Sequence, residues 1–372
     1  MSLEIGVVGA SVGVVTDRAT FVRLAPEWNS LVEATADQPF YRHEFLRIWI
    51  DNFAPGADLR ILTLRDPDGR LSAALPLMAE RASVYGVPVR QLSATANPHS
   101  CRFDMIARDP AAAAAAFVAW LRADRTWDLL RLTDVPDGGA AWALLAEART
   151  SGLPTGTWES LRSPYVPLPA TWDLFQARLH AKFKANCRRR RRKLEEKGKV
   201  ALERVEGGPA LDGVLEEGFA LEQSGWKGGR GTAIAQDPAT RGFYTELARD
   251  AAAARRLALS FLRLDGRPVA FQYGITYGGR YFLLKPGYDE TLSDCSPGQL
   301  LTEDVMADCI ARGLTEFDFL GPDMPWKRDW TDAVRRHTFL YAFADSAFGR
   351  ALCAAKFRWA PAVKQRVARW RR

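Results

Sequence analysis

The sequence is poor in the residues that hold metal ions and disulfide frameworks. Its 372 residues include five cysteines and four histidines. The cysteines are odd in number, scattered, and never spaced C-x-x-C, so the pattern indicates neither a disulfide framework nor a zinc site. No two histidines lie at the spacing of metal ligands. We therefore expect an activity that uses no metal.

Long hydrophobic runs are also missing. No apolar stretch approaches the ~20 residues that a membrane-spanning helix needs. The first residues carry Glu4 and no basic cluster, so they do not resemble a signal peptide and are expected to form a first strand. These absences predict a soluble, cytoplasmic protein.

What the chain does contain is the same order of elements twice. Each half has a helix, a strand-turn-strand hairpin, a helix that begins at a proline, and a short strand. The two hairpins turn at 66–69 and at 265–266, and the two prolines are Pro110 and Pro297. An internal duplication explains this order most simply. We predict an α+β, sandwich-like fold of tandem units, with mostly antiparallel sheets flanked by helices.

The periodicity also gives element and domain boundaries. Helices are expected at 27–36, 42–52, 110–121, 181–197 and from 296 to Gly313. Strands are expected at 59–64, 71–78, 87–92, 127–130, 257–264, 268–276, 280–285 and 317–320. The predicted domains are an N-terminal unit at 1–165 that is structural or binds the acceptor, a basic helical connector at 166–200, a C-terminal unit with the site at 201–345, and a basic amphipathic helix at 346–372.

The start of the second proline helix is the best candidate for a ligand site. Ser296 can cap this helix, with Gln299 closing an S-x-x-Q capping box. Pro297 suits the first helical position, and Gly298 leaves the backbone bare. Free N–H groups at such a helix start can bind a phosphate. The first-half helix instead begins with Asp109, whose carboxylate would repel a phosphate, so only the second copy is predicted to bind an anion.

These features resemble a known fold. The residues that carry the resemblance are Ser296 to Leu301, Gly313, Phe317 to Gly321, Lys327, Trp330, and the arginine-rich helix that ends with Leu194 to Gly198. Two tandem units with these motifs resemble the duplicated acetyltransferase (GNAT-type) fold of the Fem peptidyltransferases and of the cellulose-biosynthesis-associated acetyltransferases (BcsL/CelD type). The similarity covers residues 170 to 335 at the level of motifs.

The resemblance implies a co-substrate and the residues that hold it. Acetyl-CoA, or another acyl-CoA, would be bound with its pyrophosphate on the backbone amides of the loop that begins at Ser296. The predicted cofactor-binding residues are Lys285, Ser296, Pro297, Gly298, Gln299 and Leu300.

Acyl transfer needs a base, a polarised carbonyl and close positioning of the two reactants. The backbone N–H groups of 282–285 are candidate donors to the carbonyl. The candidate catalytic side chains are Glu222, Tyr288, Asp289, Asp318 and Lys327. Asp318 lies in the strand after the helix, but Asp128 occupies the matching place in the first half. That coincidence favours a structural role for both carboxylates.

Aromatic residues mark a candidate acceptor site. The residues assigned to it are Trp226, Gln272, Trp326 and Trp330. Two of these tryptophans interleave with Lys327 and Arg328, which suits an anionic or sugar-like acceptor or part of the cofactor. The alternative is a packed aromatic lid with solvated charges.

Two basic segments locate the formal charge of +7. In the basic run 188–193, Arg190 and Arg191 lie beside the apolar side of the predicted helix. The run is either a solvated helix face, a contact for a phosphate of the cofactor or acceptor, or an RNA-binding site. The tail places Trp359 and Trp370 among basic residues at helical spacing. Such a helix either lies on an anionic membrane or docks on its own domain.

The expected function is transfer of an acyl group from acyl-CoA to an amine or hydroxyl of a polar acceptor, such as a saccharide precursor of the cell envelope. One alternative is a Fem-type transferase that uses aminoacyl-tRNA as donor. Another is a non-catalytic binding protein built on a decayed transferase fold.

Overall fold

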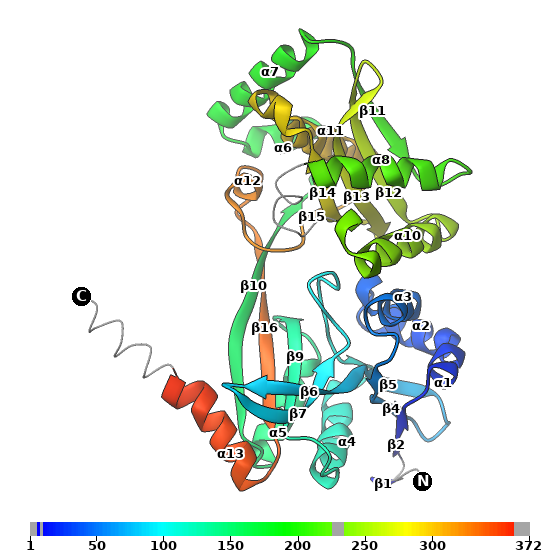
Figure 1. Ribbon diagram of the computed structural model, residues 1–372, viewed down its shortest axis with the longest axis vertical. Coiled ribbons are helices and arrows are strands. Elements are labelled where there is room, and N and C mark those ends of the chain that lie inside the picture. The colour runs from blue at the N-terminus through cyan, green and yellow to red at the C-terminus, as the bar shows by residue number, and fades with distance from the viewer. Residues whose placement is uncertain (1–5, 8–9, 225–233, 361–372) are drawn as a thin grey trace, which may run out of the picture. The chain divides into compact units, whose positions relative to one another are not determined.

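The computed structural model describes residues 6–7, 10–224 and 234–360 (Figure 1). The chain divides into two compact units. Unit 1 comprises residues 1–50, 54–161 and 336–372, and unit 2 comprises 51–53 and 162–335. Packing is a different criterion from sequence repetition, so the domain boundaries expected from the repeat stay a prediction.

Unit 1 is composed of helices and of strands that form two sheets. Its helical segments are α1 (Arg18–Arg23), α2 (Ala25–Ala34), η1 (Pro39–Tyr41), α3 (His43–Phe53), α4 (Pro110–Ala123), α5 (Ala141–Thr150), α13 (Ala347–Ala354) and η4 (Ala355–Trp359). Its strands are β1 (Gly6–Val7), β2 (Ala10–Val15), β3 (Asp58–Leu59), β4 (Ile61–Arg65), β5 (Leu71–Leu75), β6 (Leu77–Val84), β7 (Val87–Ala94), β8 (Ile106–Ala107) and β9 (Leu129–Pro136). Strands β10 (Thr155–Pro167) and β16 (Val334–Phe343) continue from one unit into the other along the chain.

The two sheets of unit 1 follow the predicted hairpins. One has the order β1-β2-β4-β5-β8, and the other runs β16-β9-β7-β6-β3. All pairs are antiparallel except β7 with β9, which are joined by the crossover helix α4. Asp109 caps α4 by accepting hydrogen bonds from the amides of Ala111 and Ala112, both at 3.0 Å. The helix start of unit 1 is therefore filled by a carboxylate.

Unit 2 is built on one sheet with the order β11-β12-β13-β14-β15-β10. Its further strands are β11 (Val200–Val205), β12 (Leu257–Leu264), β13 (Arg267–Tyr277), β14 (Arg280–Tyr288) and β15 (Glu316–Asp318). Its helical segments are α6 (Trp172–Arg178), α7 (Ala181–Glu195), α8 (Leu211–Ser224), η2 (Ile234–Gln236), α10 (Pro238–Ala253), η3 (Glu290–Cys295), α11 (Pro297–Ala311) and α12 (Pro325–Arg328). Only β14 and β15 pair in parallel.

Alternation along β13 separates the helices onto the two faces of this sheet (Figure 1). The ring of Phe271 lies against the backbone of Gly218 in α8, so close that it leaves no room for a Cβ atom there. The Tyr273 hydroxyl donates a hydrogen bond to the carbonyl of Tyr244 in α10. On the other face, Gln272 donates to Thr302 of α11. Helices α8 and α10 therefore cover one face, and α11 covers the other.

Helix α11 confirms the expected helix and its end. The apolar residues Leu301, Val305, Met306, Cys309 and Ile310 are all buried. Gly313 has φ +74°, and the amide of Leu314 returns to the carbonyl of Cys309 at 2.9 Å. A residue in this left-handed conformation ends many helices.

The predicted capping box is wrong. Ser296 adopts φ 48° and ψ 56° and makes no side-chain cap. Its hydroxyl donates to the carbonyl of Ser293 instead, and the Gln299 amide reaches Asp329. The reason is the short helix η3 immediately before α11. It brings the chain into Ser296 in a left-handed turn, whereas a capping residue needs extended backbone.

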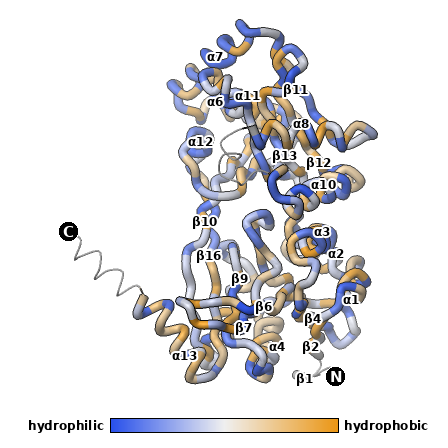
Figure 2. The backbone as a smooth tube through the Cα atoms, in the orientation of Figure 1, coloured by the Kyte–Doolittle hydropathy of each residue, from blue (hydrophilic) through white to orange (hydrophobic). Residues whose placement is uncertain are grey.

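The α+β fold with mostly antiparallel sheets is confirmed. Hydrophilic residues line much of α7 (Figure 2), while Phe183, Cys187 and Leu194 form its buried seam, as expected. Within the described ranges, no helix combines the length and the apolar character needed to cross a bilayer.

Candidate functional site

Strands β14 and β15 part beside helix α11. They pair from Arg280 with Glu316 to Phe282 with Asp318, where β15 ends. Strand β14 continues to Tyr288 and remains paired with β13 on its other edge. Beyond residue 282, the edge of β14 that faced β15 no longer pairs with it. Such an edge can add an extended ligand that carries amides, as a sheet adds a strand.

A bulge in β14 coincides with this parting. Leu283 lies opposite Gly274, but Lys285 lies opposite Tyr273, so Leu284 is an extra residue in the strand. A bulge bends a strand and changes the direction of its backbone groups. Of the amides of 282–285 that were predicted as donors to a carbonyl, those of 283–285 therefore lie where the strand bends away from its neighbour.

A buried hydrogen-bond chain ties the sheet to the first turn of α11. The Gln272 amide donates to the Thr302 hydroxyl at 2.8 Å, and that hydroxyl donates to the Gly298 carbonyl at 2.9 Å. The Tyr281 hydroxyl donates to the Gln272 carbonyl at 3.4 Å. Gln272 is 1% exposed. The structure thus places this predicted acceptor-binding residue beneath the helix start, where it positions Gly298.

The ring of Tyr288 lies against the bare backbone of Gly298. A Cβ atom on Gly298 would stand 3.3 Å from the ring, so a larger residue here would displace the tyrosine. Tyr288 is half-buried, and its hydroxyl makes no hydrogen bond to any residue that the structure describes. Pro297 and Leu300 are buried beneath the same turn. Of the predicted catalytic residues, Tyr288 keeps a polar atom open at this point.

The Asp289 carboxylate is bound by residues close to it in the structure. Its carboxylate accepts hydrogen bonds from the amide and hydroxyl of Thr291, at 3.0 and 2.6 Å, and pairs with Arg267 at 2.7 Å. Burial works against the charged form, but these hydrogen bonds outweigh it and lower the pKa of Asp289. The carboxylate caps η3, so this geometry favours a structural role.

Asp318 is fully buried in an arginine clamp. One carboxylate oxygen accepts from the amide of Leu320, and the other accepts from Arg335, both at 2.9 Å. Arg335 also pairs with Glu316 at 2.5 Å and stacks 3.8 Å from the centre of the Tyr165 ring. These contacts support the expected framework role of Asp318.

The matching carboxylate in unit 1 is also bound by an arginine. Asp128 accepts hydrogen bonds from the backbone and the side chain of Arg90. The arginine side chain lowers the pKa of Asp128. Both carboxylates are therefore bound by an arginine, but their places differ, because Asp128 precedes β9 whereas Asp318 is the last residue of β15.

Lys327 holds the turn that follows β15. Its ammonium group donates to the carbonyls of Leu320 and Pro322, at 2.6 and 2.8 Å, and the residue is 4% exposed. Leu320 and Gly321 both have positive φ, so the chain reverses sharply here. The predicted catalytic lysine thus stabilises an otherwise strained turn.

The two tryptophans of the predicted acceptor loop differ in burial. Trp330 is 4% exposed, stacked on Phe175 and edge-on to Phe183. It is a core residue, which favours the packed-lid interpretation. Trp326 is half-buried and meets Phe319 edge-on at 5.2 Å. Trp226, the other predicted tryptophan, lies outside the described residues.

Glu222 and Lys285 lie on the opposite face from α11. Glu222 accepts a hydrogen bond from the Ile234 amide at 2.8 Å and is 1% exposed. Its backbone closely approaches Gly287 of β14. The Lys285 ammonium lies 5.4 Å from the centre of the Tyr244 ring, in α10. The structure therefore does not bring Lys285 to the turn of Ser296 to Leu300, but it places Glu222 beside the parted strand.

Helix α7 supplies the cations near α11. Arg191 pairs with Asp304 at 2.5 Å and donates to the Leu300 carbonyl at 3.3 Å. Lys193 pairs with Asp294. Arg188, Arg189 and Arg192 are exposed, and none of them forms an ion pair with a carboxylate in the part of the chain that the structure describes. Arg191 therefore fastens α7 to α11, and the exposed arginines stay open to a ligand.

Sequence reasoning missed Thr302 and Arg335. Thr302 follows Gly298 by four positions, and a threonine can bond the carbonyl one turn earlier in a helix, so its contact was readable from spacing. Arg335 reaches Asp318 across 17 positions, and no local signal marks such a pair.

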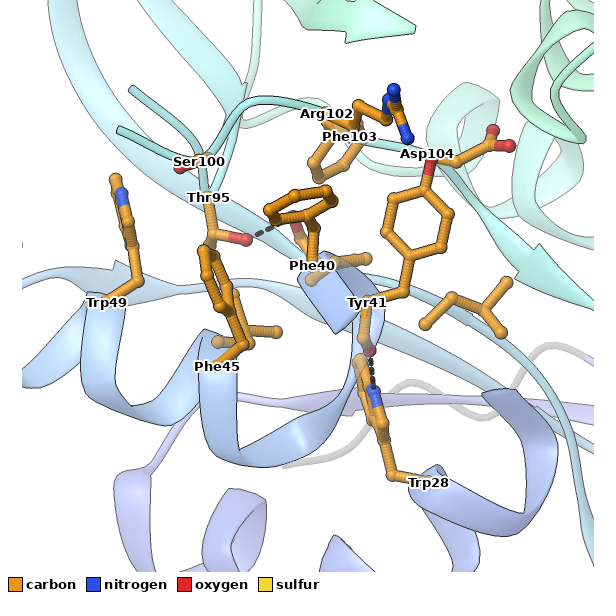
Figure 3. A pocket seen from close by; sticks show the side chains of 13 residues that line it. Trp28, Phe40, Tyr41, Phe45, Trp49, Thr95, Ser100, Arg102, Phe103 and Asp104 are labelled. Atoms are coloured by element: carbon orange, nitrogen blue, oxygen red, sulfur yellow. Dashed lines mark hydrogen bonds between the residues drawn. The ribbon is translucent and has the colours of Figure 1, made fainter. Parts of the chain in front are cut away.

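Unit 1 has a pocket of its own, between α3 and the loop after β7 (Figure 3). Its walls are formed mainly by Trp28, Phe40, Tyr41, Phe45, Trp49 and Phe103. Of its charged groups, Arg102 donates to Gln38 and lies 5.8 Å from the Phe40 ring. Asp104 accepts from the first amides of α5, and burial raises its pKa to about 6. The pocket therefore has aromatic walls, and its two charged side chains, Arg102 and Asp104, already form hydrogen bonds within the protein.

Comparison with known proteins agrees with this geometry. Residues 181–328 match the family described as Acetyltransferase (GNAT) domain. None of the curated proteins compared with the chain matches it. The solved structure of FemX superposes with a TM-score of 0.55 at 12% identity, over 85% of this chain and 95% of FemX.

Two further solved structures share the architecture. The C-terminal domain of a putative lysylphosphatidylglycerol synthetase from Agrobacterium fabrum has a TM-score of 0.53 at 13% identity, over 90% of this chain and 96% of its own. A tandem GNAT protein from the clavulanic acid biosynthesis pathway has a TM-score of 0.50 at 12% identity, over 90% and 99%. Such identities show the fold alone, and they confirm the predicted tandem architecture. Residues 181–328 therefore match the acetyltransferase (GNAT) domain family, and the chain shares the tandem GNAT fold.

Proposed function

We propose that the protein transfers an acyl group from acyl-CoA to an amine or hydroxyl of a polar acceptor. The observation that carries this proposal is the parting of β14 from β15 after Phe282, directly beside the Gly298 turn of α11. An extended chain with amides fits the free strand edge, and a phosphate fits the bare helix start. Acyl-CoA carries both groups in one molecule.

In this proposal each part of the site has one task. The edge of β14 at 283–285 binds the amide-bearing arm and donates N–H groups to the thioester carbonyl, whose oxygen gains negative charge during attack. The acceptor nitrogen or oxygen forms a bond to the carbonyl carbon, and the carbon–sulfur bond then breaks. Tyr288 supplies a proton to the departing thiolate. Glu222, on the other face of the same edge, receives the proton that the acceptor loses.

The helix start offers the sharpest test of the co-substrate. We expect acetyl-CoA and CoA to bind the full-length protein in calorimetry. Gly298→Asp should weaken binding at least tenfold, because it adds a carboxylate to the phosphate site and a Cβ atom 3.3 Å from Tyr288. Gly213→Asp is the matched control, since a side chain at Gly213 of α8 meets nothing within 4 Å. Absent binding, or equal binding by Gly298→Asp, would refute the acyl-CoA assignment.

An aminoacyl-tRNA donor is the second candidate, and the open arginines of α7 favour it. Three exposed cations, Arg188, Arg189 and Arg192, form no ion pair with a carboxylate within the described residues. Contact with tRNA phosphates would make binding fall steeply with salt. Transfer from charged tRNA that disappears when the three arginines become glutamate, without any transfer from acetyl-CoA, would favour this donor.

The acceptor class can be found by screening. Release of CoA should be followed with panels of amino sugars, saccharides and amino acids as acceptors, because a polar nucleophile is what the proposal requires. Loss of release in Tyr288→Phe and Glu222→Gln, with unchanged acetyl-CoA affinity, is the expected signature of proton transfer. If no acceptor releases CoA, no acetyl-CoA binds and charged tRNA supports no transfer, the non-catalytic alternative is correct.

A further inference from the structure

The net charge of the protein is concentrated in its last 27 residues. Residues 346–372 contain eight lysines and arginines and no aspartate or glutamate. The remaining 345 residues have 43 basic against 44 acidic residues, a formal charge of −1. Three of these cations lie in described elements of unit 1: Arg350 in α13, and Lys356 and Arg358 in η4 (Figure 1).

Aromatic side chains are exposed around these elements. Trp158 of β10 is 45% exposed, and Trp359 of η4 is 60% exposed. Trp158 packs on Phe357 with ring centres 6.3 Å apart, and Phe357 packs on Tyr341 of β16 at 5.6 Å. We call these residues, together with the hairpin tip described next, the aromatic face.

The tip of the β6-β7 hairpin extends the aromatic face. Tyr85 is 61% exposed and Val87 is 42% exposed. Val84, just before the tip, packs against the same cluster of Tyr341 and Phe343. Large apolar side chains this exposed mark an interaction surface when they gather in one place.

Two cations lie among these rings without an acidic partner. The Lys356 ammonium is 4.6 Å from the centre of the Tyr341 ring and 5.8 Å from that of Trp158. The Arg131 guanidinium lies 5.8 Å from the centre of the Phe339 ring. Neither side chain forms an ion pair with a carboxylate in the described part of the chain. Burial, and then the charge of Arg131, lower the pKa of Lys356, so an anion from outside would stabilise both charges.

We propose that the aromatic face of unit 1 binds the surface of an anionic lipid bilayer. Indole and phenol rings favour the boundary between headgroups and acyl chains. Lysine and arginine beside them pair with anionic headgroups, and a lysine stem among rings keeps its charge at the water side. The aliphatic Val87 at the hairpin tip suits a bilayer better than a nucleic acid, which would stack only on rings. This inference does not depend on the acyl-transfer proposal.

Sedimentation of the full-length protein with vesicles tests the surface. We expect binding to vesicles of equal parts phosphatidylcholine and phosphatidylglycerol, and weak binding to phosphatidylcholine alone. Trp158→Ala with Lys356→Gln should reduce the affinity at least tenfold. The matched control is Leu174→Ala with Lys182→Gln in unit 2, which removes an exposed apolar residue and an exposed cation elsewhere and should bind as the unchanged protein does.

A second variant keeps the test independent of folding. Tyr85→Ser with Val87→Ser changes the exposed hairpin tip and should weaken vesicle binding at least threefold while the melting temperature stays unchanged. Binding that survives both face variants, or that depends only on cations after residue 360, would overturn the proposal. A failure of the unchanged protein to bind both kinds of vesicle would also overturn it. If both variants instead abolish a tighter binding to an RNA oligomer, the surface is a nucleic-acid site and the lipid proposal is wrong.

Discussion

Asn in place of Asp318 distinguishes a framework carboxylate from a catalytic base. In the structure, Asp318 is fully buried and accepts hydrogen bonds from Arg335 and from the Leu320 amide, each at 2.9 Å. Asparagine can still accept from Leu320 but removes the charge that Arg335 requires. A hydrogen bond to a charged group contributes about 1.5–3 kcal/mol. Because the Arg335 side chain is 28% exposed, water partly replaces the lost partner, and we expect Asp318→Asn to destabilise the protein by about 2 kcal/mol.

Urea unfolding measures this loss, and an exposed pair provides the control. Asp323 makes a two-armed ion pair with Arg328 at 2.7 Å on both arms, but it is 28% exposed and its partner is 32% exposed. Asp323→Asn should therefore lower the free energy of unfolding by less than about 1 kcal/mol. Both variants replace an arginine-bound carboxylate with an amide, and the Asp323 pair has the more complete contact with its arginine, so a larger loss at Asp318 reports the effect of burial.

Kinetics decides between the two roles. A framework residue should leave the rate of acyl transfer per folded molecule within about tenfold of the unchanged protein, whereas loss of a general base lowers it by about a hundredfold or more. An Asp318→Asn protein that is as stable as the original but a hundredfold slower would refute the framework role.

Three other substitutions test the supports of the site and the pocket. Thr302→Val leaves the buried Gln272 amide without its acceptor and should lower the free energy of unfolding by about 2 kcal/mol, measured in urea; an unchanged value would show that the contact adds nothing. Lys327→Met leaves two carbonyls of the turn after β15 without their donor and should cost about 2–3 kcal/mol, and a lysine that acted in catalysis alone would cost nothing in the same unfolding experiment. Asp104 has its pKa raised from 3.8 to about 6 in the folded protein, so the folded state binds the proton more tightly and this contribution to stability is lost as the pH rises through that window. Relative to Asp104→Asn, the protein should therefore lose about 2 kcal/mol of stability between pH 4 and pH 7, and a constant difference would contradict the assigned environment.

Local pattern predicted helix α11 but not the conformation of its first residue. The spacing of Leu301, Val305 and Cys309 depends only on the helical period, and all three are buried as expected. The role of Ser296 depended on the segment before it, which was expected to be a loop. That segment forms η3, and the chain leaves it through a left-handed residue. A side chain that suits a cap cannot act as one from that backbone conformation.

Long-range contacts explain why the site was only partly predictable. Composition drew attention to Trp330 and Lys327, but it did not give the partners that each side chain has in the structure. Trp330 packs on Phe175, and Lys327 bonds carbonyls of a turn whose shape follows from where β15 ends. Neither distance is written in local spacing. The sequence therefore indicated the segments that form the candidate site. Packing determines which of their side chains lie in the core and which, like that of Tyr288, keep a polar atom exposed.

The duplication within the chain gives an internal reason to place the activity in unit 2. In unit 1 the parallel strands β7 and β9 pair from Gln91 to Ser93, and β7 ends at Ala94, one residue later. In unit 2 the matching strand β14 continues six residues past its last partner at Phe282. Helix α4 starts on the carboxylate of Asp109, whereas α11, which follows β14 and η3, starts on the bare backbone of Gly298. Both differences act in the same direction, because a ligand with amides and phosphates needs a free strand edge and an unblocked helix start together. Unit 2 has both features, and the corresponding segments of unit 1 have neither.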